Sequence, residues 1–109
     1  MKLQTGTLIQ PGATGNQTTT LPAGFDPKAI ILWCTPQTAD GSVARARFSY
    51  GFATYRSGAV QQWYSTVNDN DNVGTAVVEI GQGTGALAKL FSNDALVDLE
   101  IALVSMTTG

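Results

Sequence analysis

Two stretches of the chain, 43–52 and 96–106, alternate in side-chain character with a period of two residues. Successive side chains of a β-strand point to opposite faces, so this period is typical of a strand with one buried face. A helix over 96–106 would instead spread the apolar residues around its axis. The apolar phases that we expect to face the core are Ala44, Ala46, Phe48, Tyr50 and Phe52 in the first stretch and Val97, Leu99, Ile101 and Leu103 in the second.

The opposite phases of these stretches carry charge. Arg45 and Arg47 lie on the polar phase of the first stretch, and Asp98 and Glu100 lie on that of the second. Opposite charges on neighbouring strands stabilise a sheet, so ion pairs between these arginines and carboxylates are expected, within one chain or between chains.

Short extended runs separated by turn residues make up the rest of the chain. The run 28–35 is apolar on both pleat faces, which is typical of a strand in the centre of a sheet, and Gly51 marks a weak strand end or a bulge. About eight short strands with turn signals every 8–12 residues predict an all-β fold, an antiparallel β-sandwich of jelly-roll-like form. The further expected strands are 3–9, 16–21, 59–66 and 75–80, and 86–91 fits either a short strand or one helical turn.

Length and charge limit the organisation and the partners of the protein. The 109 residues suffice for one domain, 1–109, and only 13% of them are charged, against about 25% in an average soluble domain. So little surface charge favours association between copies. Six scattered basic residues and a net charge of −2 argue against nucleic acid as a partner.

Neither a cleaved signal peptide nor a membrane segment is expected. The N-terminus turns polar at once, and the longest apolar run, 29–34, is far shorter than the roughly 20 residues that cross a bilayer. We therefore expect a protein made in the cytoplasm, with no membrane insertion.

The composition argues against most classes of enzyme. The chain has no histidine, the commonest general base and metal ligand. Its single cysteine, Cys34, excludes an intrachain disulfide and a thiolate zinc site. We therefore expect a protein that is not an enzyme and that uses no cofactor.

One acidic motif offers oxygen ligands for a cation. Asp69 and Asp71 are spaced like the first ligands of a calcium loop. Such a loop needs a glutamate at position twelve, where this chain has Ile80, with Glu79 one place early. A solvated loop over 68–72, rich in Asn and Asp, explains the motif more simply than a calcium site does.

Two other motifs are weak. The glycines at 81, 83 and 85 resemble a phosphate loop, but no helix follows, and a tight turn needs the same residues. The close carboxylate pairs, 69/71 and 98/100, are of the kind that hydrolyses glycosides, but a domain this small rarely encloses a substrate cleft.

The aromatic residues around Arg56 are the best candidates for binding. Tyr55, Trp63 and Tyr64 flank the expected turn at 56–58. Because neighbouring strand residues face opposite ways, one of Trp63 and Tyr64 is expected in the core and the other outside. An exposed aromatic side chain anchors a subunit contact or stacks on a sugar, so we expect an interface, with glycan binding as the alternative. The segment 11–21 is a second expected contact zone.

The order of several motifs resembles a β-domain that recurs in virion proteins of tailed phages. The matching residues are 21–41, including Gly-Phe-Asp-Pro-Lys-Ala-Ile-Ile-Leu-Trp at 24–33, then Phe-Ser-Tyr-Gly-Phe-Ala at 48–53 and the loop before Val73. The resemblance implies a jelly-roll-like structural module, present in symmetric copies in a tail, a fibre or the capsid surface. It implies no catalytic residue. Similar domains continue with a further hairpin beyond Met106, where this chain ends at Gly109, and an edge left open there would be covered by a neighbouring subunit.

Overall fold

A computed structural model of the chain describes residues 2–9, 14–37, 40–41, 47–70, 77–91 and 97–106, with Asn70, Val77 and Glu79 described in their backbone only. These residues contain strands, turns and extended segments and no helix. The six strands are β1 (Ala29–Cys34), β2 (Arg47–Arg56), β3 (Ala59–Asn70), β4 (Val77–Thr84), β5 (Ala88–Phe91) and β6 (Val97–Ile101).

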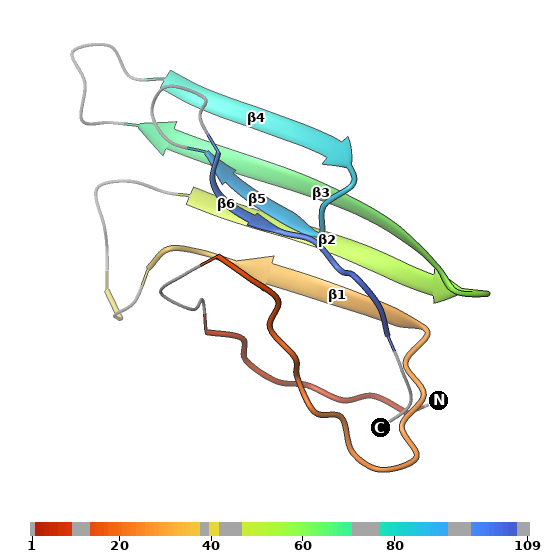
Figure 1. The fold of residues 1–109 in the computed structure, drawn as a ribbon. Coiled ribbons are helices and arrows are strands. Elements are labelled where there is room, and N and C mark those ends of the chain that lie inside the picture. Colours follow the sequence, from red (N-terminus) through yellow and green to blue (C-terminus); the bar gives the residue numbers. More distant parts are fainter. Residues whose placement is uncertain are drawn as a thin grey trace.

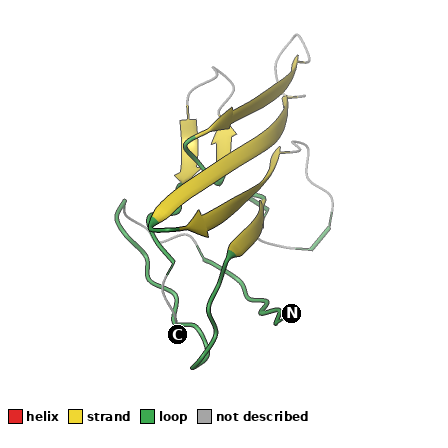
Figure 2. Cartoon of the chain, turned by 90° about the vertical axis from the view of Figure 1, so that its right-hand side faces the viewer, coloured by secondary structure: helices red, strands yellow, loops and turns green. Residues whose placement is uncertain are grey.

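The strands form two antiparallel sheets. Sheet A has the order β1-β2-β3-β4, so each strand pairs with its neighbour in the chain, and sheet B is the hairpin of β5 and β6 (Figure 1). The hairpin lies against one face of sheet A, which we call the inner face, and no described strand lies on the other, which we call the open face (Figure 2). The all-β antiparallel fold is confirmed, whereas the described residues form six strands and do not show the expected eight-stranded sandwich of jelly-roll-like form.

A two-residue turn sets the register of the long hairpin β2–β3. Arg56 pairs with Ala59, and the residues between them, Ser57 and Gly58, have φ angles of 52° and 79°. Positive φ at both positions defines a type I′ turn, whose twist matches that of the two strands. The turn expected at 56–58 is therefore where β2 reverses into β3.

Small side chains in the middle of β2 determine how closely the two sheets approach. Ser49, Gly51 and Ala53 alternate on the inner face and are buried. A Cβ atom at Gly51 would collide with the carbonyl oxygen of Leu87 and with that of Trp63. The backbone N–H of Lys89 donates to Ser49 Oγ over 3.1 Å. The backbone of the 87–89 segment therefore lies directly on β2, which explains Gly51 without a bulge.

The core between the sheets is small and partly polar. Thr66 Oγ1 donates to Phe48 O, and Ser49 Oγ donates to Ser65 O, each over 3.1 Å, so these buried hydroxyl groups are hydrogen-bonded. Gly81 and Gly83 of β4 leave room for the rings of Phe91 and Tyr64. The buried apolar residues are Ala53, Ala86, Leu87, Ala88, Leu90 and Met106.

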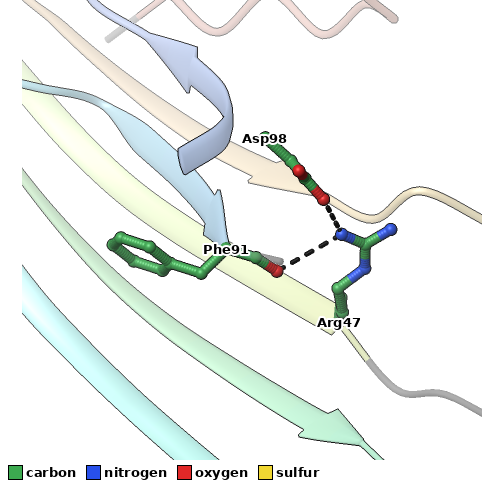
Figure 3. A network of polar contacts seen from close by, with 3 residues as sticks. All are labelled: Arg47, Phe91 and Asp98. Atoms are coloured by element: carbon green, nitrogen blue, oxygen red, sulfur yellow. Dashed lines mark hydrogen bonds and ion pairs between the residues drawn. The ribbon is translucent and has the colours of Figure 1, made fainter. Parts of the chain in front are cut away.

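Two ion pairs involve the hairpin, one joining it to β2 and one joining its own two strands. Arg47 Nη1 of β2 donates to Phe91 O over 3.3 Å and also contacts the carboxylate of Asp98 (Figure 3). Lys89 Nζ and Glu100 Oε2 lie 2.9 Å apart, across β5 and β6, and this hydrogen bond raises the pKa of Lys89. The expected pairing of Arg47 with Asp98 is thus confirmed within one chain, whereas Glu100 binds Lys89 and Arg45 lies outside the described residues.

The expected orientation of the 43–52 strand is wrong. Phe48, Tyr50 and Phe52 lie on the open face of sheet A, and the intervening residues from Arg47 to Ala53 face the hairpin. The reason is steric, because the close backbone contact at Gly51 leaves no space on the inner face for bulky side chains. Residues 43–46 of this expected strand lie outside the described part.

Several other expected elements differ from those observed. The apolar run 28–35 is not central, because β1 forms an edge of sheet A, with Ile31 and Trp33 exposed. The expected loop at 68–72 begins inside β3, and the expected turn at 81–85 begins inside β4. Segments 3–9 and 16–21 form no strand, whereas 86–91 contains β5, and β6 ends at Ile101 rather than at 106.

The contact at Gly51 predicts a large loss of stability in Gly51→Ala. The added methyl group must push the 87–89 backbone off β2, at a cost of about 3 kcal/mol or more in the free energy of unfolding. Gly6→Ala is the control, because nothing lies within 4 Å of a Cβ built there. Urea unfolding followed by circular dichroism measures both variants, and an unchanged midpoint for Gly51→Ala would contradict the packing of the hairpin on β2.

Candidate functional site

The open face of sheet A collects the large apolar side chains of four strands. Residues paired directly across an antiparallel sheet point to the same side. Phe52 is paired with Ile31 on one side and Trp63 on the other, and Tyr50 is paired with Trp33. The nine exposed large apolar residues of this face are Ile31, Trp33, Phe48, Tyr50, Phe52, Trp63, Val67, Val78 and Ile80.

The exposed apolar area of this face is larger than a monomer usually tolerates. The nine side chains range in exposure from 36% at Trp63 to 76% at Ile80. With roughly 200 Å² for a large side chain and about half of it exposed, they present on the order of 900 Å². The largest apolar patch of a typical monomer is about 300–600 Å². One partner in a standard protein interface buries about 800 Å². The open face therefore has the size of an interface.

The aromatic rings of this face are ordered by stacking. The ring centroids of Phe52 and Trp63 lie 4.7 Å apart with 21° between their planes, and those of Phe48 and Tyr50 lie 6.4 Å apart with 26°. Offset stacking of this kind contributes about 1 kcal/mol beyond the buried area and restricts the side chains to few rotamers. A partner that binds this face therefore meets side chains that are already ordered.

Charge is sparse on the open face and lies at its ends. By register, Arg56 lies at the turn end of the face, and Asp69 lies near the other end of β3, paired with Val78. The described side chains between these two residues on the face are apolar or uncharged, such as Ser65, Gln61 and Gln82. The centre of the face is therefore suited to burial, since no charge there must lose its hydration.

The residues predicted from the sequence as binding residues do not form one surface. Trp63 lies on the open face and Tyr64 on the inner face, with the Lys89 ammonium 5.5 Å from the Tyr64 ring centroid, so the prediction of opposite orientations is confirmed. Tyr55 is half-buried in the inner phase of β2, and Arg56 is exposed beside the turn. Only Trp63 and Arg56 therefore belong to the open face.

Sequence reasoning missed most of the open face because it assigned the bulky phase of β2 to the core. One signal pointed the other way. The phase opposite Phe48, Tyr50 and Phe52 contains Ser49, Gly51 and Ala53, which are small enough for another backbone to approach. When the side chains on one side of a strand are small and those on the other are bulky, the small ones face the neighbouring backbone that approaches most closely.

The calcium motif is only partly visible. Asp69 lies in β3, whereas Asp71 lies outside the described residues. Among the residues that the structure describes, no three His, Cys, Asp or Glu side chains gather into a possible metal site. Calcium binding by Asp69 and Asp71 stays an untested alternative to the solvated loop.

The remaining reactive or membrane-related features are few in the described part of the chain. Burial raises the pKa of the half-buried Cys34 thiol, and a backbone hydrogen bond from Ser49 lowers it to a smaller extent. No helix long and apolar enough to cross a membrane occurs among the described residues. An open depression of about 240 Å³ beside Trp63 is smaller than the roughly 300–1,000 Å³ of most ligand pockets.

Comparison with known proteins finds no relative. No family model matches the chain, and neither curated proteins nor solved structures show significant similarity to it. The resemblance to phage virion domains therefore stays a prediction.

Proposed function

We propose that the protein is a non-enzymatic structural subunit that assembles by packing the open face of sheet A against the open face of a second copy. The observation that carries this proposal is the set of nine exposed apolar side chains, which outnumber the buried apolar residues of the described core. Packing them against a second copy removes this surface from water, which is the dominant favourable contribution to most protein association.

The geometry of the face favours a second sheet as the occupant. Two sheets pack about 10 Å apart with their strands nearly aligned, and side chains of both faces interdigitate between them. An interface of one face with itself is the form found in two-fold symmetric dimers, the commonest oligomers. The dimer would be a β-sandwich with a β5–β6 hairpin on each outer side.

The charged residues favour one orientation of the two copies. A two-fold axis that runs across the strands places the Arg56 end of one face over the Asp69 end of the other. An axis along the strands would instead place Arg56 of one copy near Arg56 of the other. The first arrangement brings opposite charges together and the second brings like charges together. The first is therefore favoured, and in it each strand of one copy runs antiparallel to the equivalent strand of the other.

The setting that we propose for this assembly is a phage virion, as a tail, fibre or capsid-surface subunit. The support is the resemblance of residues 21–41 and 48–53 to virion β-domains, together with a low charge that suits repeated copies. In that setting the partners are further copies and other virion proteins, and no chemical reaction is required.

The proposal predicts that charge on the open face prevents association. Ile31 and Trp33 are 61% and 63% exposed, so Ile31→Lys/Trp33→Lys should leave the folded chain intact. It should raise the dissociation constant measured by sedimentation velocity at least tenfold, because four lysines would meet in the interface. Val104→Lys/Ser105→Lys is the matched control, since these exposed residues lie outside sheet A. A monomeric wild-type protein at high concentration, or equal effects of the two variants, would contradict the proposal.

A second candidate function is binding of a carbohydrate or receptor at a fibre tip. The observation in its favour is the depression beside Trp63, whose lining includes Gln61, Gln62 and Thr84. An aromatic ring beside amide and hydroxyl groups is the combination that stacks on a sugar and hydrogen-bonds its hydroxyl groups.

A glycan array separates the two functions. If the protein is a lectin, it binds a defined glycan, and Trp63→Ala abolishes that binding while assembly in sedimentation stays intact. We expect no specific glycan signal from the wild type. A signal that disappears in Trp63→Ala and persists in Val104→Lys/Ser105→Lys would establish the second function.

A further inference from the structure

The N-terminal arm, which we define as residues 2–9, is an extended segment that does not pack on the rest of the chain. Every residue of the arm is exposed, including Leu3 at 81% and Ile9 at 79%. The radius of gyration of the chain is 15.5 Å, whereas a compact domain of this length has about 13 Å. The exposure of these apolar side chains to water is unfavourable in free energy, and a partner that covered them would relieve it.

The pattern of the arm is that of a strand. Leu3, Thr5, Thr7 and Ile9 occupy one phase, and β-branched residues of this kind favour extended backbone. The other phase has Gln4, Gly6 and Leu8. The sequence predicts a strand over 3–9, and within the chain this segment forms none. A strand needs an edge to pair with, and within its own chain the arm pairs with none.

No described strand pairs with the outer edge of β4. Among the described strands β4 is hydrogen-bonded only to β3, and its register with β3 is continuous, without a bulge. Soluble proteins usually protect such an edge with lysine, proline or a bulge. The sequence of β4, Val-Val-Glu-Ile-Gly-Gln-Gly-Thr, contains neither lysine nor proline, and Glu79 is its single charged residue. Within the described part of the chain, this edge therefore leaves backbone groups unpaired by any strand and accessible to another one.

We propose that the arm of one copy adds as a strand to the β4 edge of another copy. The arm and β4 are both eight residues long. With Leu3 and Ile9 on the open-face side, the arm extends the apolar rows that end at Val78 and Ile80, both exposed on that side. Backbone hydrogen bonds supply affinity in such strand addition, and alternate side chains supply the register.

The occupant of the edge is a second copy rather than the same chain. The arm leaves its own body beside β1, and β4 lies at the opposite edge of sheet A, beyond β2 and β3 (Figure 1). This inference rests on the proposed function, because it adds a second contact to the same self-association. Face packing closes at two copies, whereas arm addition runs from one copy to the next and builds larger assemblies.

Proline substitutions in the arm test this inference. Neighbouring strand residues point their N–H groups to opposite edges, so Thr5→Pro/Gly6→Pro removes a donor whichever edge of the arm is used. Sedimentation velocity should show assemblies beyond the dimer for the wild type and only dimers for this variant. Val104→Pro/Ser105→Pro, in another exposed segment outside the strands, is the matched control and should behave as the wild type.

Crosslinking tests the docking position directly. In a Cys34→Ser background, Leu3→Cys chains are mixed with Ile80→Cys chains and treated with a short bismaleimide. The mixture should yield more crosslinked dimer than a mixture of Leu3→Cys with Val104→Cys chains, and equal yields would overturn the inference.

The two proposals fail in different ways. Arm addition would be overturned, and face packing left in place, by one pair of results. Thr5→Pro/Gly6→Pro would assemble as the wild type does, and Ile31→Lys/Trp33→Lys would lose association. Loss of the larger assemblies in the arm variant, with no effect of the two lysines on the dissociation constant, would overturn face packing.

Discussion

The contact between the hairpin backbone and the middle of β2 determines the rest of this structure. Gly51 has no side chain, and the Leu87 carbonyl occupies the position that a Cβ atom would take. Ser49 accepts the N–H of Lys89, so the same strand positions both admit the hairpin and satisfy its polar backbone. Because successive residues of a strand alternate between faces, this contact also places Phe48, Tyr50 and Phe52 on the opposite side.

A small core and a large exposed apolar face are two consequences of that contact. The described core consists mainly of alanines and polar residues, with Leu87, Leu90 and Met106 as its larger apolar members, so it removes little apolar surface from water. The open face retains the tryptophans and most other aromatic side chains of sheet A. A chain organised in this way gains much of its stability when its copies associate, since a ligand or partner that binds only the folded state stabilises it. Folding and assembly are thus coupled in the function that we propose.

The sequence predicts the strands of this fold better than their orientation. Alternation correctly indicates the strands observed over 47–52 and 97–101, because the period of two follows from backbone geometry alone. It does not show which phase is buried, since that depends on the Leu87 backbone, 36 residues further along the chain from Gly51. The run at β1 is apolar on both phases for a similar reason, because one phase faces the hairpin side and the other forms part of the proposed interface. Trp63 could be proposed from the sequence as a binding residue, because it and Tyr64 must point in opposite directions. Ile31, Val78 and Ile80 become candidates for the open face only once the register of the strands is known.

The two tryptophans of the chain, Trp33 and Trp63, both lie on the open face, so tryptophan fluorescence reports on this surface alone. The most direct test of the central claim is the tryptophan emission maximum measured over a dilution series from assembled protein to isolated chains. If the open face is exposed in the single chain and buried between copies, the maximum is at the wavelength of water-exposed tryptophan at high dilution and shifts to shorter wavelength as concentration rises. Emission at short wavelength that persists at the highest dilution would show that these side chains are buried within one chain, and it would contradict the account.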